Sequence, residues 1–188
     1  MNAAAFNVGT VVIGGKESPR GLVRHHELLT AYADGTMADR GADGEAYLSH
    51  FAFDAGLQRH YAANGNSVAG YAGPCWCRRL VLDIDRADAA AALADARRLV
   101  AFLQCRYPES EGAVPVWFSG SKGFHIAVEL AHAPPPAVGF HQVARTFAEQ
   151  LAAAAGVVID TGVYDLARII RLPNTRHPRT GLYKRLID

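Results

Sequence analysis

The stretch LVLDID at residues 80–85 decides how the second half of this chain folds. Apolar and acidic residues alternate at its end as they do along a strand with one buried face. Side chains at positions i and i+2 of a strand point to the same side of the sheet. Asp83 and Asp85 should therefore project together, with Leu82 and Ile84 on the opposite side. The stretch predicts a strand that ends in two adjacent carboxylates.

Two neighbouring carboxylates repel each other unless a cation lies between them. An all-oxygen ligand set favours Mg²⁺ or Mn²⁺. The alternative is a strand that runs into a polar turn, in which Asp85 or Asp88 caps the next helix. We assign Asp88 mainly to the cap.

The elements that follow this strand alternate between helix and strand patterns. A helix is predicted over residues 88–107, ahead of Pro108, and a second over 140–155, ahead of Gly156. The expected buried faces are Leu93, Ala96, Val100 and Leu103 on the first helix, and Phe140, Val143, Phe147 and Leu151 on the second.

Shorter segments complete the second half. Residues 114–119 and 124–130 are two β-rich runs around a glycine-rich turn, which predicts a hairpin. Residues 157–159 are expected to form a short strand that ends at Asp160, and a helix is one interpretation of 165–170. The order strand, helix, hairpin, helix, strand indicates an α+β fold: a sheet similar to that of RNA-recognition (RRM) domains, with helices packed on it.

The first 75 residues have a weaker pattern. A short strand is expected at 11–13, and helical or mixed segments at 22–33 and 45–63, before a turn at 64–66. We expect a single domain over 1–188, with a smaller N-terminal α/β lobe (1–75) and an RRM-like catalytic core (76–188).

Composition limits the classes that fit. The chain has 188 residues, half hydrophobic and a fifth charged, as in an ordinary globular protein of one domain. No apolar run approaches the roughly 20 residues that cross a bilayer, and the N-terminus lacks secretory signal features. Three cysteines suit a reducing compartment and argue against a disulfide framework. We expect a cytoplasmic protein without a membrane partner.

The turn between the hairpin strands carries polar groups suited to an anion. Ser119, Ser121, Lys122 and His125 surround two glycines, and exposed amides beside a lysine form a phosphate pocket. The glycine spacing is not that of a P-loop. The alternative is a solvated turn, with His125 a hydrogen-bonded core residue.

A cationic segment lies near the end of the chain. Between residues 168 and 185 it has six cations and no carboxylate: Arg168, Arg171, Arg176, Arg179, Lys184 and Arg185. Such a patch suits a polyphosphate or a nucleic-acid backbone. The alternative is a solvated basic tail, but the interleaved apolar residues indicate that part of the segment is packed.

Taken in order, these segments resemble the motifs of the archaeo-eukaryotic primase (AEP) superfamily, over roughly residues 47–187. Asp83 and Asp85 resemble its first, metal-binding motif, and the Ser119–His125 turn is similar to its second, Ser-Gly-x-Lys/Arg-Gly-x-His. Asp160 resembles the third, and the run 168–181 looks like the Arg-rich, His-containing segment after it. Arg179 and Thr175 stand where the family commonly has lysine and serine, and both exchanges keep the chemistry.

The resemblance implies DNA primase or polymerase activity by a two-metal mechanism. Asp83, Asp85 and Asp160 would bind two Mg²⁺ or Mn²⁺ ions and would be the catalytic residues. Nucleotide phosphates would be bound by Ser119, Ser121, Lys122, His125, Arg171, His177 and Arg179. Implied partners are nucleoside triphosphates and single-stranded DNA template with primer, and a helicase, a helical accessory domain or a large subunit are further candidates.

Three other interpretations remain open. The same carboxylates suit a two-metal nuclease, although that activity does not explain a triphosphate pocket. A non-catalytic RRM-like module for single-stranded nucleic acid would need stacking aromatic residues on its sheet. Asp165 is a rival third ligand, although pairing with Arg168 or capping fits it better.

Structural zinc is not expected, because the spacing of Cys75, Cys77 and Cys105 is poor for it; we expect buried free thiols.

Overall fold

The computed structural model describes residues 2–15, 17–35, 44–108, 114–130 and 132–187. Strands and helices alternate along the chain. In order, the elements are η1 (Ala3–Ala5), β1 (Val8–Ile13), β2 (Gly21–Arg24), α1 (His25–Ala33), β3 (Ala46–Ser49), β4 (Ala52–Phe53), α2 (Ala55–Ala63), β5 (Cys75–Trp76), β6 (Arg79–Ile84), α3 (Ala89–Arg106), β7 (Val116–Phe118), β8 (Phe124–Glu129), α4 (Phe140–Ala155), η4 (Thr161–Tyr164), β9 (Ile169–Arg171) and β10 (Arg185–Ile187).

The strands form two antiparallel sheets. The first has the order β5-β4-β1-β3-β9, with β2 paired to β1, and the second has the order β10-β7-β8-β6. Strand β9 lies late in the sequence but pairs with β3 of the N-terminal half, with Ile170 opposite Leu48. The segment that follows Asp160 therefore connects the second sheet to the first. The mixed α+β fold expected from the sequence is confirmed.

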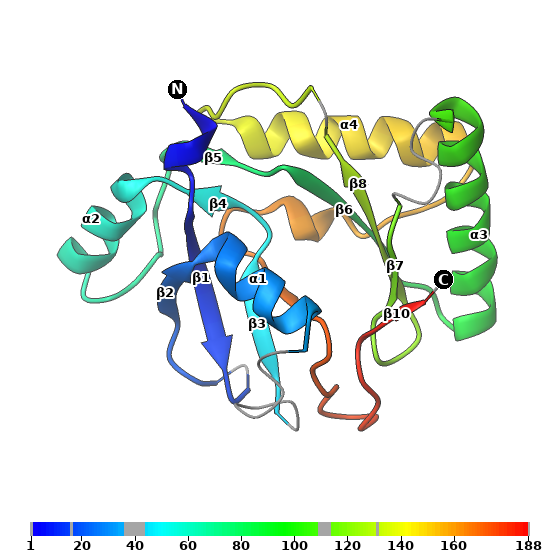
Figure 1. Ribbon diagram of the computed structural model, residues 1–188, viewed down its shortest axis with the longest axis horizontal. Helices are drawn as coiled ribbons and strands as arrows, with labels where there is room; N and C mark the ends of the chain where they lie inside the picture. Colours follow the sequence, from blue (N-terminus) through cyan, green and yellow to red (C-terminus); the bar gives the residue numbers. More distant parts are fainter. Residues whose placement is uncertain (1, 16, 36–43, 109–113, 131, 188) are drawn as a thin grey trace.

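One face of the second sheet is covered by α3 and α4 (Figure 1). Leu80, Leu82 and Ile84 of β6 are fully buried and share one core cluster with apolar side chains of both helices. The alternation of β6 places Asp83 on the opposite face, as predicted from the LVLDID stretch. Packing of one face thus leaves the acidic face open for a site.

The predicted helices are confirmed, but part of their predicted buried faces is wrong. Asp88 caps α3 by accepting a hydrogen bond from the Ala91 amide, and α4 ends at Gly156 in the left-handed conformation. On α4, however, Val143 and Phe147 are 55% and 37% exposed. The side chains that α4 buries are Phe140, Ala144, Ala148, Leu151 and Ala152. Alanines spaced four apart let this helix approach the core closely, so the larger apolar groups point outward.

The buried face of helix α3 also differs from the predicted one. Leu93 and Val100 are only partly buried against the core, and Leu99 is fully buried. The predicted Ala96 and Leu103 are buried. The charged Asp95 is also buried, where it pairs with Arg86 and Arg98.

Two short predictions are wrong. Residues 157–159 belong to none of the strands in the described part of the chain. Next to them, the Asp160 amide donates to the Asp83 carbonyl at 2.8 Å and ties the segment to β6. Residues 165–170 are not helical; their end belongs to β9, which finds its partner in β3. Both errors concern segments whose conformation depends on distant strands.

The N-terminal half is more regular than the sequence indicates. The strand expected at 11–13 starts at Val8, and the segment 22–33 divides into β2 and α1. The segment 45–63 divides into β3, β4 and α2, and Asn66 in the following turn has a positive φ of 60°. Cys75 and Cys77 are buried as expected, but Cys105 is exposed. None of the helices in the described part of the chain has the length and apolar character to cross a membrane.

The packing of α3 on the sheet gives a stability prediction. Leu99→Ala should lower the free energy of unfolding by about 2–5 kcal/mol, because it removes a fully buried side chain and leaves a cavity. Urea unfolding measures the change. The neighbouring exposed Arg97→Ala is the control and should stay within about 0.5 kcal/mol of the parent protein. Equal stability of the two variants would contradict the packing described here.

Candidate active site

The first wall of the site is the end of β6. Asp83 lies opposite His125 of β8 in the antiparallel register, and Asp85 follows directly after the strand. The Asp83 Oδ1 atom lies 3.6 Å from His125 Nε2, and Asp85 Oδ1 lies 3.6 Å from Lys122 Nζ. The two carboxylates thus face groups of the predicted phosphate pocket.

Asp160 joins them from a segment far along the chain. Its amide donates to the Asp83 carbonyl, so its backbone is tied to β6. Its Oδ1 atom accepts a hydrogen bond from the Gly162 amide at the start of η4, and its Oδ2 atom lies 3.8 Å from Arg168. Arg168 therefore pairs with Asp160, whereas the carboxylate of Asp165 accepts from the Ala167 amide. Of the two roles expected for Asp165, pairing with Arg168 is therefore wrong, and the bond to the Ala167 amide agrees with capping of the following segment.

The carboxylates influence each other electrostatically. Burial, followed by the negative charge of Asp160, raises the pKa of Asp83 from 3.8 to about 7; Asp85 adds to the rise, and Lys184 and Arg168 oppose it. A buried carboxyl that is held among other carboxylates is costly to ionise unless a cation joins it. The arrangement is typical of a functional site.

The turn between β7 and β8 is held close to these acids. The Ser119 amide donates to the Gly123 carbonyl at 2.9 Å, and the Ser119 hydroxyl accepts from the Gly123 amide at 3.2 Å. A Cβ atom at Gly123 would lie only 2.6 Å from the Ile84 carbonyl oxygen, so no side chain fits there. Glycine thus lets the turn pack against the end of β6.

The C-terminal segment covers the same turn. The Thr180 hydroxyl donates to the Gly120 carbonyl, and the His177 ring accepts from the amides of Arg179 and Thr180 at 3.3 Å. A Cβ atom at Gly120, whose φ is +89°, would lie 3.0 Å from the Leu182 carbonyl oxygen. These contacts place His177 and Arg179 beside the serine- and lysine-bearing turn.

The walls enclose a cavity of about 250 Å³. The structure brings all ten sequence-predicted site residues to its lining: Asp83, Asp85, Ser119, Ser121, Lys122, His125, Asp160, Arg171, His177 and Arg179. Arg171 is held by Tyr47, whose ring lies 4.8 Å from the guanidinium and whose hydroxyl accepts from it at 2.9 Å. The cavity is therefore lined both by carboxylates and by groups that bind anions.

Two cations near the site were not predicted as site residues. Arg168 lines the cavity beside Asp160. Lys184 is buried, and its Nζ atom lies 2.9 Å from His125 Nδ1 and 2.8 Å from the Arg171 carbonyl oxygen. Burial lowers the pKa of Lys184 to about 7, although the charge of Asp83 opposes the shift. Arg168 and Lys184 both belong to the cationic segment noted in the sequence, but the spacing of its residues does not show which cation is buried.

The three carboxylates are of the right chemical type to bind divalent cations, but in this structure they are not close enough together to share one ion. All three carboxylates supply hard oxygen donors, and burial together with their mutual repulsion raises the pKa of Asp83. Within the described residues, however, no three acidic, His or Cys side chains converge closely enough to hold one ion together. His125, Lys122 and Arg168 instead contact Asp83, Asp85 and Asp160 respectively. Binding of an ion would require the carboxylates to exchange these contacts.

Comparison with known proteins confirms the fold. No protein-family model and no curated protein matches the sequence. Among solved structures, the chain is similar to the AEP domain of the cyanophage S-2L primase–polymerase (PrimPol), with a TM-score of 0.52 and 15% identity over 97% of this chain and 82% of that one. It is also similar to the polymerase domain of Mycobacterium tuberculosis ligase D, solved in complex with DNA, with a TM-score of 0.52 and 16% identity over 98% and 74%. At such identities the likeness shows the fold, which is the one that the sequence motifs implied.

Proposed function

We propose that this protein is a nucleotidyltransferase that adds nucleotides to a DNA primer, or begins one, on a single-stranded template. The observation that carries the proposal is a single cavity lined by three carboxylates together with serine, lysine, histidine and arginine side chains. Two proteins with a similar fold are a primase–polymerase and a polymerase domain, which agrees with this chemistry. Primase and polymerase are therefore the activities to test.

The carboxylates would serve the reacting end of the nucleotide. Asp83, Asp85 and Asp160 would hold two Mg²⁺ or Mn²⁺ ions, which, when bound, would activate the 3′-hydroxyl and offset the charge of the triphosphate and the departing pyrophosphate. A bond would form between the 3′-oxygen and the α-phosphorus as the bond to pyrophosphate breaks. Positioning and charge neutralisation carry such chemistry, so no nucleophilic side chain is required.

The cationic and polar side chains of the lining, the phosphate-binding wall, would hold the triphosphate. Lys122 and Arg179 would pair with phosphate oxygens, and the serine hydroxyls and histidine rings would donate hydrogen bonds. Arg171 would lie at the rim, where Tyr47 orients it. Each charge-assisted contact is stronger than a neutral hydrogen bond.

Lys122→Ala tests this wall. We expect the KM for the nucleotide to rise about 10-fold or more, because a hydrogen bond to a charged group contributes about 1.5–3 kcal/mol. Nucleotide-concentration series in a primer-extension assay measure the change. The matched control is Arg145→Ala, which removes an exposed cation on α4 that pairs with Glu149 away from the cavity. A nucleotide KM that is unchanged in Lys122→Ala would reject the assignment.

A binding experiment separates this proposal from a nuclease or a plain nucleic-acid binder. A nucleoside triphosphate with Mn²⁺ should raise the melting temperature, since a ligand at 100 times its Kd stabilises the folded state by about 2.7 kcal/mol. Mn²⁺ alone and Mn²⁺ with a nucleoside are the references. No further stabilisation by the triphosphate would count against a triphosphate pocket and favour the nuclease.

A further inference from the structure

The buried Lys184 has no part in the wall that would hold the triphosphate. Only 5% of its surface is exposed, and it is absent from the lining of the cavity. Its backbone is fixed, because its amide donates to the Thr175 carbonyl and its carbonyl accepts from the Asn174 amide. A lysine is rarely buried unless its ammonium group is paired. Its contacts therefore indicate what it does.

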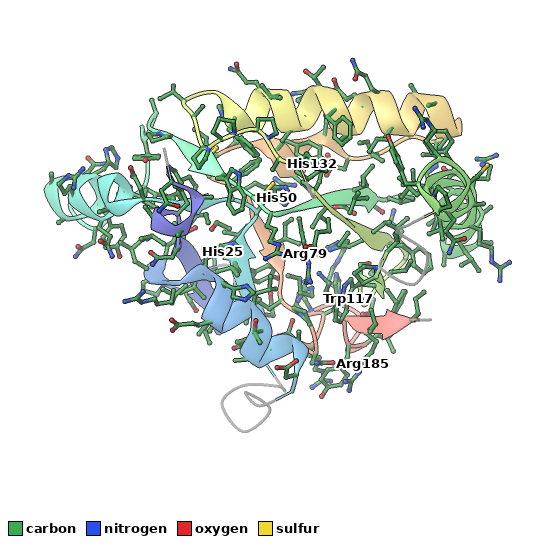
Figure 2. The ribbon with its side chains drawn as sticks, turned by 45° about the horizontal axis from the view of Figure 1, so that its top comes forward. His25, His50, Arg79, Trp117, His132 and Arg185 are labelled. Carbon is green, nitrogen blue, oxygen red and sulfur yellow. The ribbon has the colours of Figure 1, made fainter. Side chains whose placement is uncertain are left out.

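Three neighbours surround the Nζ atom of Lys184. The Arg171 carbonyl oxygen, 2.8 Å away, can only accept a hydrogen bond, and the His125 Nδ1 atom lies at 2.9 Å. The ring of Trp117, on β7 opposite His125, has its centroid 5.9 Å away. Trp117 and Arg185 lie on the neighbouring strands β7 and β10, which pair with Leu186 opposite Trp117 (Figure 2). An aromatic face favours an ammonium ion, which has three hydrogens to donate and no lone pair to accept.

These contacts decide which nitrogen of His125 carries its hydrogen. If Lys184 donates to Nδ1, that nitrogen is unprotonated, and the hydrogen of the neutral ring lies on Nε2. Nε2 is the atom that faces Asp83 Oδ1 at 3.6 Å, where a hydrogen is favourable and a lone pair would repel the carboxylate. An ammonium group can only donate, so the 2.9 Å contact leaves Nδ1 without a hydrogen and the ring neutral. The contact of Nδ1 with Lys184 and the contact of Nε2 with Asp83 thus both favour the tautomer with its hydrogen on Nε2.

We propose that Lys184 is a positioning residue that fixes His125 as the Nε2–H tautomer, so that the ring presents a single N–H donor to a phosphate oxygen of the nucleotide. The use of this donor rests on the proposed function. Because the same ammonium also binds the Arg171 carbonyl, it joins β9 of the first sheet to β8 of the second beside the cavity. One side chain therefore orients the histidine and links the backbone segments that carry two predicted phosphate-binding residues.

The tautomer can be measured without any nucleotide. Two-bond ¹H–¹⁵N correlation spectra of histidine-labelled protein distinguish a protonated ring nitrogen from an unprotonated one. The chain has eight histidines, so the signals of His125 are identified by their loss in His125→Gln. At a pH below the pKa of Lys184, which is about 7, Lys184 is an ammonium ion, and there we expect Nε2 protonated and Nδ1 unprotonated in the parent protein. A hydrogen on Nδ1 in the parent protein would overturn the proposal, whatever happens to any variant.

Lys184→Met tests the cause, because methionine has a similar length and fits an apolar site but cannot donate. We expect mixed or reversed tautomers of His125 and a nucleotide KM raised about 10-fold through loss of the oriented donor. Arg185→Met, which removes the adjacent exposed cation bound to Asn174, should leave the His125 spectrum unchanged. An unchanged His125 spectrum in Lys184→Met would refute the role of Lys184. If the parent protein shows the Nε2–H tautomer but binds no nucleotide, the positioning role of Lys184 is supported and the proposed function fails.

Discussion

Replacement of Asp83 by asparagine should abolish nucleotide addition, with a fall in rate of at least about 10³-fold. Asparagine keeps the shape of the side chain but removes the charge that would hold a divalent cation between the carboxylates. Asp83 is well placed for this role, because it lies opposite His125 and its backbone carbonyl binds the amide of Asp160. Incorporation of a labelled nucleotide into a primer measures the effect, and circular dichroism checks that the fold survives.

Two neighbouring aspartates supply comparison variants for this result. Asp85→Asn should behave in the same way, since Asp85 lines the same cavity. Asp88→Asn should retain activity, because Asp88 caps α3 outside the cavity and asparagine caps a helix equally well. Polymerisation that persists in the double variant Asp83→Asn/Asp85→Asn would remove the carboxylates from the mechanism.

The second large effect concerns stability as a function of pH. The folded state raises the pKa of Asp83 from 3.8 to about 7, so the folded state binds this proton more tightly than the unfolded state does. Its favourable contribution is complete below pH 3.8 and is lost as the pH rises through about 7. The amide side chain in the variant Asp83→Asn cannot ionise and avoids this loss. With a chelator present, the variant should gain up to about 4 kcal/mol relative to the parent protein between pH 4 and pH 8.

Urea unfolding at pH 4.5 and at pH 8 measures the gain. Asp88→Asn, which keeps the cap of α3, is again the control. Mn²⁺ added at pH 8 should stabilise the parent protein more than Asp83→Asn, because the ion offsets the repulsion among the carboxylates. Parallel stability curves for the parent and Asp83→Asn would show that the carboxyl is not perturbed as described.

The parts that sequence could predict depend on local periodicity. The alternation in residues 80–85 places Asp83 opposite to Leu82 and Ile84, and the fully buried leucine and isoleucine confirm it. The hairpin around the Ser119–Gly123 turn follows from two apolar runs that are separated by glycines, and β7 and β8 pair as expected. The resemblance of the motifs, taken in order, led to a fold that the structure and its comparisons confirm.

The parts that sequence could not predict depend on distant partners. Strand β9 exists because β3, more than a hundred residues earlier, supplies its hydrogen bonds, whereas residues 157–159 have a similar apolar pattern and no such ladder. Val143 and Phe147 are more hydrophobic than Ala144 and Ala148, yet the alanines face the core because α4 packs closely. The burial of Lys184 follows from the meeting of β8, β9 and the segment before β10, which no local pattern contains.

The most direct test of the central claim is extension of a labelled primer on four single-stranded templates that differ only at the first templating base. Each reaction contains the protein, Mn²⁺ and one nucleoside triphosphate at a time. We predict that the primer grows only when the nucleotide complements the template, and that Asp83→Asn gives no product. Absence of extension on all four templates, or equal extension by Asp83→Asn, would contradict the assignment of this cavity to nucleotide addition.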